Sequence, residues 1–393
     1  MKLPLEDVRV LDLSRLLPGP YCSLILADLG AEVIKVESPD EGDYLRWLPP
    51  RQGHGSGFFH ALNRNKLSLA IDLKKPLGRE TFLSLVAAGV DVVIESFRPG
   101  VMDRLGLGYE DLRAARPEII LCSISGHGQE GPRRRRPGHD LNFIGLAGVL
   151  GLCGPSSGAP VIPGVQVADV GGGLMGVIGI LTAIHKKKTT GDGSWIDISM
   201  TEAALSFLSM QIGARSAMSG PVDRGGGLLL GAVPAYSVYR TKDGGYMTLA
   251  AIEERFWKAF CRSVGREDMV GAGMKTGEEG LQAKQELEAV FESRTRDEWV
   301  AHFEKYDVCC EPVYEGDELF QDQQHRYRGS FVDCEISEEE VARHVACPVR
   351  FVGSQGHAVR PSPALGADTE TVLAEAGFDE SALQRLRAAG VIA

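Results

Sequence analysis

One aspartate of the chain lies in a segment whose composition suggests chemistry, VQVADVGGGLMGVIGIL. We expect Asp169 to end an extended segment and three glycines to lead into a helix that begins near Gly172. A carboxylate at a helix N-terminus is stabilised by the helix dipole and by unpaired N–H groups, and glycines let a substrate approach the backbone. Asp169 taken alone could equally be an N-cap, although a cap needs no run of glycines behind it.

A second candidate is the His139-Asp140 pair in RRRRPGHDLNF, which follows a Pro-Gly break. Side chains at such a break can project into a cleft, and histidine can act as base or acid near neutral pH. The alternatives are a structural histidine and an aspartate that caps a helix or orients its neighbour. The four arginines at 133–136 could border the same pocket or form a solvated loop.

Common catalytic motifs are absent. The first expected strand is followed by SRLLPGP, so a dinucleotide-binding turn and a dehydrogenase are unsupported. Neither a GxxxxGK[ST] nor an HExxH motif occurs. The 8 cysteines form no CxxC pair, so we expect reduced packing cysteines and no metal site.

The elements that must position these residues follow an alternating order. Apolar runs predict strands at 8–13, 32–37, 67–73, 90–96, 118–125 and 195–200, with helical stretches between them. This order predicts a doubly wound α/β fold with a parallel sheet. We expect a large α/β domain from 1–219 plus 331–393, with a last helix near 367–389. A small α+β domain is expected at 220–330, with a hairpin around Lys-Asp-Gly-Gly.

Composition excludes several function classes. The net charge of -11 argues against a nucleic-acid surface, because neutralising phosphates needs a basic excess. Apolar runs are interrupted well before 18 residues, so no membrane-spanning helix is expected, and the N-terminal stretch does not resemble a signal peptide. We therefore expect a cytoplasmic protein that contacts neither nucleic acid nor membrane.

Several blocks in combination resemble the family of α-methylacyl-CoA racemase and its class III CoA-transferase relatives. They are LPGPYCSLILADLGAEVIKVE, NRNKLSLAIDLK, ESFRPGVMDRLGLGYEDL, SGHGQEGP, PGHDLNF, VADVGGGLMGVIGIL, YRTKDGGYMTLAAIEERFW and CCEPV, which cover nearly the whole chain. The resemblance implies a large domain built from both chain ends, a small domain, and two chains interlocked as linked rings in a homodimer.

The resemblance also implies site residues. In the transferase branch, the aspartate matching Asp169 is a nucleophile that forms acyl-enzyme intermediates. In the racemase branch, the residues matching His139 and Asp169 are two proton-transfer bases, and Glu253 matches a glutamate that supports the histidine. Inverting a carbon beside a thioester needs one base on each face and donors for the enolate oxygen, which we assign to backbone N–H groups around Asp140.

Coenzyme A enters as part of the substrate, and no permanently bound cofactor is expected. The resemblance places its site on the NRNK and FRPG segments, where the candidate residues are Asn63, Arg64, Lys66, Arg98 and Arg104. Arginine suits phosphate because it donates bidentate hydrogen bonds. For each of the five, the alternative is a solvated surface side chain.

Three functions follow from these residues. The favoured one is a racemase or epimerase of 2-methyl-branched acyl-CoA thioesters. The second is CoA transfer between an acyl-CoA and a carboxylic acid through Asp169. The third is an acyl-CoA-binding partner subunit without catalysis. The segment LLLGAVPAY departs from the racemase pattern at Leu230, Ala232 and Val233, which predicts a more apolar acyl pocket.

Overall fold

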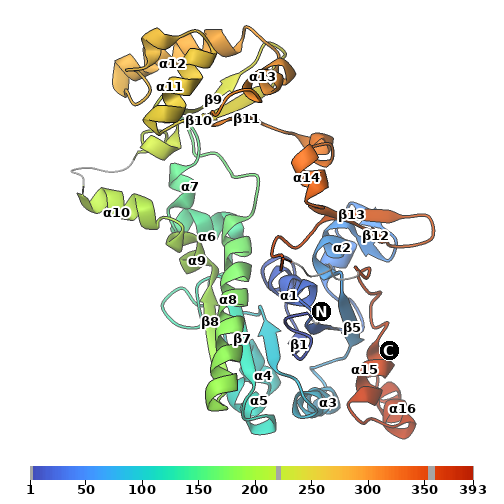
Figure 1. Ribbon diagram of the computed structural model, residues 1–393. Helices are drawn as coiled ribbons and strands as arrows, with labels where there is room; N and C mark the ends of the chain where they lie inside the picture. Colours follow the sequence, from blue (N-terminus) through green and yellow to red (C-terminus); the bar gives the residue numbers. More distant parts are fainter. Residues whose placement is uncertain (1–2, 218–222, 353–358, 393) are drawn as a thin grey trace. The chain divides into compact units, whose positions relative to one another are not determined.

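The computed structural model describes residues 3–217, 223–352 and 359–392 (Figure 1). The chain forms two compact units. The first combines residues Met1–Ala147, Gly164–Phe207 and Gln323–Ala393, and the second combines Gly148–Pro163 and Leu208–Asp322. The first unit therefore uses both chain ends. The sequence placed the boundaries at 219/220 and 330/331, and the former lies outside the described residues.

The first unit is built on a six-stranded sheet with the order β5-β2-β1-β6-β7-β8. All neighbouring strands are parallel. The strands are β1 (Arg9–Asp12), β2 (Glu32–Glu37), β5 (Lys66–Ala70), β6 (Val92–Glu95), β7 (Ile120–Ser125) and β8 (Ser194–Ser199). This confirms the mixed α/β class and the parallel sheet expected from the apolar runs.

Helices flank this sheet, and short hairpins complete the unit. The helices are α1 (Pro18–Asp28), α2 (Gly57–Asn63), α3 (Pro76–Ala87), α4 (Val101–Leu105), α5 (Tyr109–Ala115), α6 (Asp140–Leu146), α8 (Val167–Thr190), α9 (Met200–Ser206), α14 (Gln323–Tyr327), α15 (Thr369–Glu375) and α16 (Glu380–Ala388). The hairpins pair β3 (Arg51–Gln52) with β4 (Gly55–Ser56), and β12 (Phe331–Glu335) with β13 (Val341–Val345).

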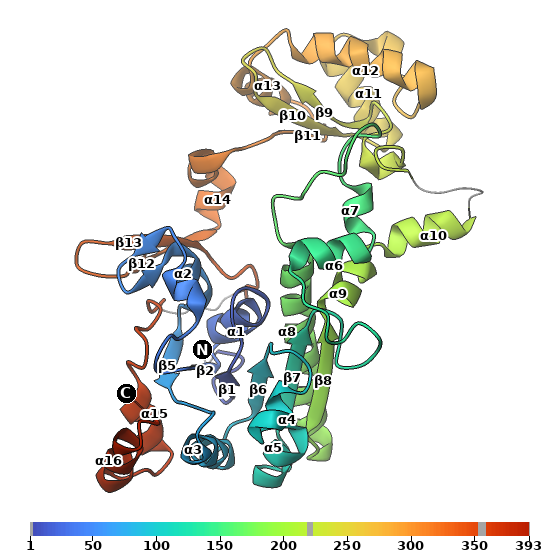
Figure 2. The same ribbon diagram turned by 180° about the vertical axis from the view of Figure 1, so that it is seen from behind.

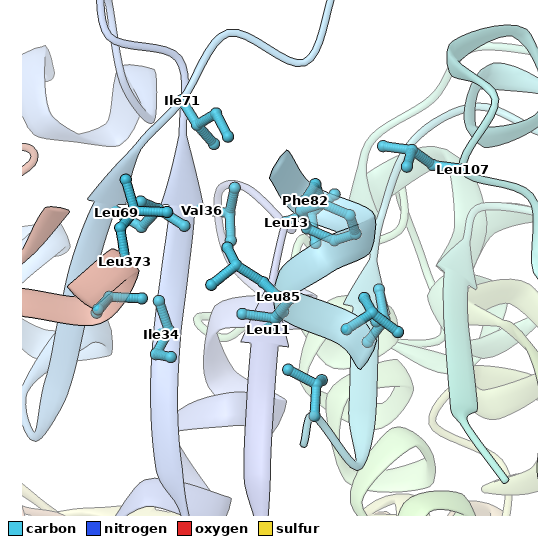
Figure 3. Packing of buried hydrophobic residues seen from close by; sticks show 14 of the residues in the cluster. Leu11, Leu13, Ile34, Val36, Leu69, Ile71, Phe82, Leu85, Leu107 and Leu373 are labelled. Atoms are coloured by element: carbon cyan, nitrogen blue, oxygen red, sulfur yellow. The ribbon is translucent and has the colours of Figure 1, made fainter. Parts of the chain in front are cut away.

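One face of the sheet forms a continuous apolar core with α3, α4, α5 and the C-terminal helices α15 and α16. Figure 3 shows side chains of β1 and β2 meeting those of α3, β5 and α15. Its labelled members are Leu11, Leu13, Ile34, Val36, Leu69, Ile71, Phe82, Leu85, Leu107 and Leu373. Burying them favours folding by about 25 cal/mol for each Å² of apolar surface removed from water. The C-terminal helices thus complete the core begun by the N-terminal strands.

The other face of the sheet is covered by α1 and α8. Figure 2 shows α8 running along β7 and β8. By length and composition alone α8 could cross a membrane, but half of its most apolar stretch is buried within the protein. It packs on α1, α9 and the sheet, which is the environment of a core helix.

Two helix assignments from the sequence were wrong. α8 begins at Val167 rather than near Gly172, so Asp169 lies inside its first turn. The stretch near 367–389 contains two helices, α15 and α16, because Gly377 between them adopts a φ of +92°, which ends the first helix.

The second unit contains a three-stranded sheet of order β11-β10-β9 packed on helices. The predicted hairpin joins β9 (Tyr236–Arg240) to β10 (Tyr246–Ala250), and β11 (Cys310–Pro312) adds to β10. Its helices are α7 (Val149–Leu152), α10 (Ser209–Ala217), α11 (Glu254–Ser263), α12 (Gly277–Phe291) and α13 (Arg296–Phe303). An aromatic core with stacked Tyr239, Phe291, Phe260 and Trp257 holds it together.

A candidate active site where two helices begin

His139 lies immediately before the first residue of α6. Its backbone is fixed on that helix, because its N–H donates to Asn142 Oδ1 at 3.0 Å and its carbonyl accepts from the Asn142 N–H at 2.8 Å. The His139 side chain is exposed. The imidazole that follows the Pro-Gly break is therefore accessible from solvent, and its role as a base stays a prediction.

Asp140 joins the start of α6 to the start of α8. Its Oδ1 accepts hydrogen bonds from the N–H groups of Ala168 at 2.6 Å and Asp169 at 3.1 Å. The residue that follows His139 thus contacts the backbone of Asp169. The two predicted bases, far apart in the sequence, lie on adjoining helix termini of one compact unit.

The environment of Asp169 favours its neutral form. Burial, followed by the charge of nearby Asp140, raises the pKa of Asp169 to about 7. A helix N-terminus alone would lower this pKa. Here the carboxylate of Asp140 occupies the first amides of α8 and adds a negative charge, so burial and repulsion prevail. A carboxyl that ionises near neutral pH is suited to moving protons.

Two backbone donors at the start of α6 remain available. Within the described chain, the N–H groups of Asp140 and Leu141 have no hydrogen-bond acceptor. They lie beside the predicted bases and could donate to an oxygen that develops negative charge, the role expected for amides around Asp140.

The glycines after Asp169 serve the packing of helices, which differs from the substrate approach expected from sequence. A Cβ on Gly173 would lie 2.7 Å from the Pro18 carbonyl oxygen, and a Cβ on Gly172 would lie 2.7 Å from Met200 Cγ. The glycines therefore let α8 lie close against α1 and α9. This contact fixes the direction in which α8 presents Asp169.

His127 has a structural role. Its Nδ1 lies 3.0 Å from Thr201 Oγ1, whose own proton goes to the Gly126 carbonyl at 2.7 Å. The threonine can therefore only accept, so Nδ1 carries the imidazole proton. The ring also packs edge-on against Phe143 of α6. His127 thus ties the loop after β7 to α6 and α9.

Glu253 immediately precedes α11 in the second unit. Its support of His139 would join the two units and stays a prediction. Among the described residues, no group of three or more His, Cys, Asp and Glu side chains is arranged to hold a metal ion.

Three of the five residues predicted to contact CoA are buried in internal hydrogen-bond networks. The Lys66 ammonium lies 3.3 Å from Asp12 Oδ2 and donates to Ser23 Oγ at 2.7 Å and Asn63 Oδ1 at 3.0 Å. Burial lowers the pKa of Lys66 to about 8 although Asp12 opposes this. This network fastens β5 to β1 and α1, and CoA contact by Asn63 or Lys66 remains a prediction.

The rest of the NRNK segment contacts both α1 and the C-terminal part of the chain. Arg64 pairs with Asp28 at 2.5 Å. Asn65 adopts a φ of +62°, and its backbone and side chain make reciprocal hydrogen bonds with Arg360. Arg64 and Asn65 of this motif therefore hold segments of the same chain together.

The FRPG segment, in contrast, presents exposed cations at a recognised ligand-binding position. It follows β6, and the strand order reverses direction between β1 and β6, where α/β proteins bind ligands beyond the carboxyl ends of the strands. Arg98 and Arg104 are exposed, and neither has an acidic partner within the described chain. A cavity of about 430 Å³ adjoins Pro99 and Gly100, but its lining extends to β8 and includes neither Arg98 nor Arg104.

Arg15 is a further candidate at this position. Its N–H donates to Ser96 Oγ at 3.1 Å, and its guanidinium lies 5.5 Å from the Phe97 ring centroid. The signal in the sequence was its place in SRLLPGP after the first strand. Sequence alone could not show that this loop meets the FRPG segment.

Comparison with known proteins agrees with the resemblance. The profile of CoA-transferase family III matches residues 5–369. The chain is 33% identical to succinyl-CoA:glutarate CoA-transferase of Mus musculus, over 99% of this chain and 90% of that protein. It is also 33% identical to α-methylacyl-CoA racemase of Homo sapiens, over 99% of this chain and 98% of that protein. A CAIB/BAIF family protein from Brucella suis has the same fold, with a TM-score of 0.84 and 32% identity. The match covers 96% of this chain and 100% of that chain.

Proposed function

The chain belongs to CoA-transferase family III, and on this premise we propose that it is a racemase of 2-methyl-branched acyl-CoA thioesters. The observation that supports the proposal is the hydrogen-bonded contact between two helix starts through Asp140, since His139 and Asp169 stand at these two helix starts. Inversion needs two bases near one carbon, and this arrangement supplies an imidazole and a carboxyl that ionises near pH 7.

In this mechanism one base removes the proton on the α-carbon of the thioester. The electron pair moves onto the thioester oxygen and forms a planar enolate. The N–H groups of Asp140 and Leu141 would stabilise that oxygen, since they have no acceptor within the described chain. The other base then returns a proton to the opposite face, and Glu253 would support His139.

The CoA moiety would bind along the FRPG segment. Arg98 and Arg104 are exposed and would contact its phosphates, with Arg15 beside them. Contact by Asn63, Arg64 and Lys66 would require these side chains to leave their buried partners.

The proposed assembly is an interlocked homodimer in the cytoplasm. Three apolar side chains form an exposed stripe on α8, namely Leu174, Ile178 and Leu181. A continuous apolar stripe on a core helix is typical of a surface that another chain covers. A second copy of this chain would bury it.

CoA transfer is the second candidate. It is favoured by equal similarity to a succinyl-CoA:glutarate CoA-transferase. In this reaction the Asp169 carboxylate would attack the thioester and release CoA as a thiolate, leaving an acyl anhydride on Asp169. His139 would then have no required role.

One incubation separates these functions. The protein is mixed with a single epimer of a 2-methylacyl-CoA in D2O, with and without a free carboxylic acid. Deuterium at C2 together with loss of optical purity, independent of the acid, is expected for the racemase. Acyl exchange that requires the carboxylic acid, with an intermediate trapped by hydroxylamine, would contradict the racemase and support the transferase. Binding without either reaction would contradict both and leave a non-catalytic acyl-CoA-binding subunit.

A further inference from the structure

We infer that Asp140 is a positioning residue whose carboxylate sets the spacing of His139 and Asp169 and supplies the negative charge against which Asp169 ionises. This inference rests on the proposed function, because it concerns the two bases of that reaction. It assigns the aspartate side chain a task separate from that of its backbone N–H group.

The geometry supports the spacing role. Asp140 is the first residue of α6, and His139 before it is fixed to the same helix by Asn142. A single oxygen of Asp140 then holds the amides of both Ala168 and Asp169. Asp169 is therefore hydrogen-bonded through its N–H to a carboxylate that is only 9% exposed, and His139 is the chain neighbour of that same residue.

The start of α8 depends on this contact. Gln166 occupies the N-cap position of α8, and its side chain makes no capping hydrogen bond. Asp140 supplies the missing acceptor from another element. An uncapped helix start frays, so Asp169 would lose its fixed position without this acceptor.

The charge role follows from the groups around this end of α8. Titratable side chains on the elements that pack there are His139 and Asp140 at α6, Glu202 on α9, and Tyr21, Cys22 and Asp28 on α1. Asp28 is paired with Arg64. Asp140 is the charged group that acts on Asp169, and together with burial it raises the pKa of Asp169.

Asp140→Asn separates the two tasks. The amide oxygen still accepts from Ala168 and Asp169, but the charge is gone. We expect kcat to stay within roughly tenfold of the native value. The midpoint of the limb of the pH–rate profile that is due to Asp169 should shift to lower pH by roughly one unit. An Asp140 that acted only as a helix cap would leave this limb in place, which would overturn the charge role.

Two further variants complete the test. Asp140→Ala removes acceptor and charge, so activity is expected to fall at least roughly 100-fold at every pH. Asp379→Asn is the matched control, because Asp379 caps α16 through the same kind of contact, a hydrogen bond of 2.8 Å from the Ala382 N–H. It should change neither the rate nor the pH profile. Native activity in Asp140→Ala would overturn the spacing role.

A readout without turnover keeps this inference apart from the proposed function. The carbonyl stretch of the protonated Asp169 carboxyl is followed by infrared titration and assigned by its loss in Asp169→Asn. We expect the stretch to titrate at lower pH in Asp140→Asn than in the native protein. An unchanged midpoint would overturn the inference even in an active racemase. A shifted midpoint would support it even if neither reaction were found.

Discussion

At the scale of single residues, the central feature is a carboxyl group placed where its ionisation is costly. Asp169 is half-buried, and its N–H donates to the carboxylate of Asp140. The sequence indicated Asp169 by its glycine-rich surroundings and His139 by its Pro-Gly break. It could not show that Asp140 connects them, since that contact spans 28 residues and depends on how α6 meets α8.

The raised pKa of Asp169 makes stability depend on pH. Between about pH 4 and 7 the folded protein binds more protons here than the unfolded chain, whose carboxyl has the ordinary pKa of 3.8. The stabilisation is complete below pH 4 and is lost as pH rises through 7. We expect Asp169→Asn to raise the free energy of unfolding at pH 8 by on the order of 2 kcal/mol and to change it little at pH 4.

Urea titrations at the two pH values would measure this difference. A matched control is Asp197→Asn, on the opposite face of the sheet from α8, where Asp197 accepts from the Gln129 N–H. If Asp169→Asn does not raise the free energy of unfolding at pH 8, the described environment of Asp169 is contradicted.

Exposed Arg98 of the FRPG segment and exposed Arg104 of α4 give a second residue-scale prediction. Arg98→Ala and Arg104→Ala should each raise KM for the acyl-CoA roughly tenfold, the loss of one charged hydrogen bond, with little effect on kcat. Arg113→Ala on α5 is the control, because Arg113 is also exposed but pairs with Glu110. Steady-state kinetics with native-like KM in both variants would remove this segment from the CoA site.

At the scale of elements, α8 carries Asp169, and the contacts around α8 explain why its start was misplaced from sequence. Apolar runs located the strands correctly because burial dictates them. The start of α8 was misplaced because its cap comes from Asp140 rather than from a neighbouring residue. Nothing near Lys66 in the sequence indicated its buried partner Asp12.

The glycines of α8 can be tested through packing. Gly173→Ala would place a Cβ 2.7 Å from the Pro18 carbonyl oxygen, so α1 and α8 must separate. We expect a loss of roughly 1–3 kcal/mol in the free energy of unfolding and a lower kcat. Gly213→Ala in α10 is the matched control, since nothing lies within 4 Å of a Cβ there. Equal stability of the two variants in denaturant titrations would contradict close packing at Gly173.

At the scale of the whole molecule, the fold class followed from sequence, and contacts divide the chain into two compact units. Both chain ends build the first unit, because α15 and α16 cover the apolar core. The residues 148–163 belong to the second unit, although they lie between segments of the first. Local patterns cannot reveal such an assignment, because it depends on contacts between distant segments.

The proposed homodimer predicts a change in mass. Ile178 is 57% exposed on the apolar stripe of α8, so Ile178→Glu should place a charge in the interface and give monomers. Thr189→Glu, exposed near the end of the same helix, should remain dimeric. Sedimentation velocity at micromolar concentration measures both. A native protein that sediments as a monomer would contradict the assembly.

The most direct test of the two-base proposal is exchange of the α-proton by single-base variants. Each epimer of a 2-methylacyl-CoA is incubated in D2O with native protein, His139→Ala and Asp169→Asn, and C2 deuterium and chirality are measured by NMR. The native protein should label and invert both epimers. Each variant should invert neither, while any residual labelling is confined to the epimer that faces the remaining base, a different one for each variant. Undiminished inversion by either variant would contradict the proposal.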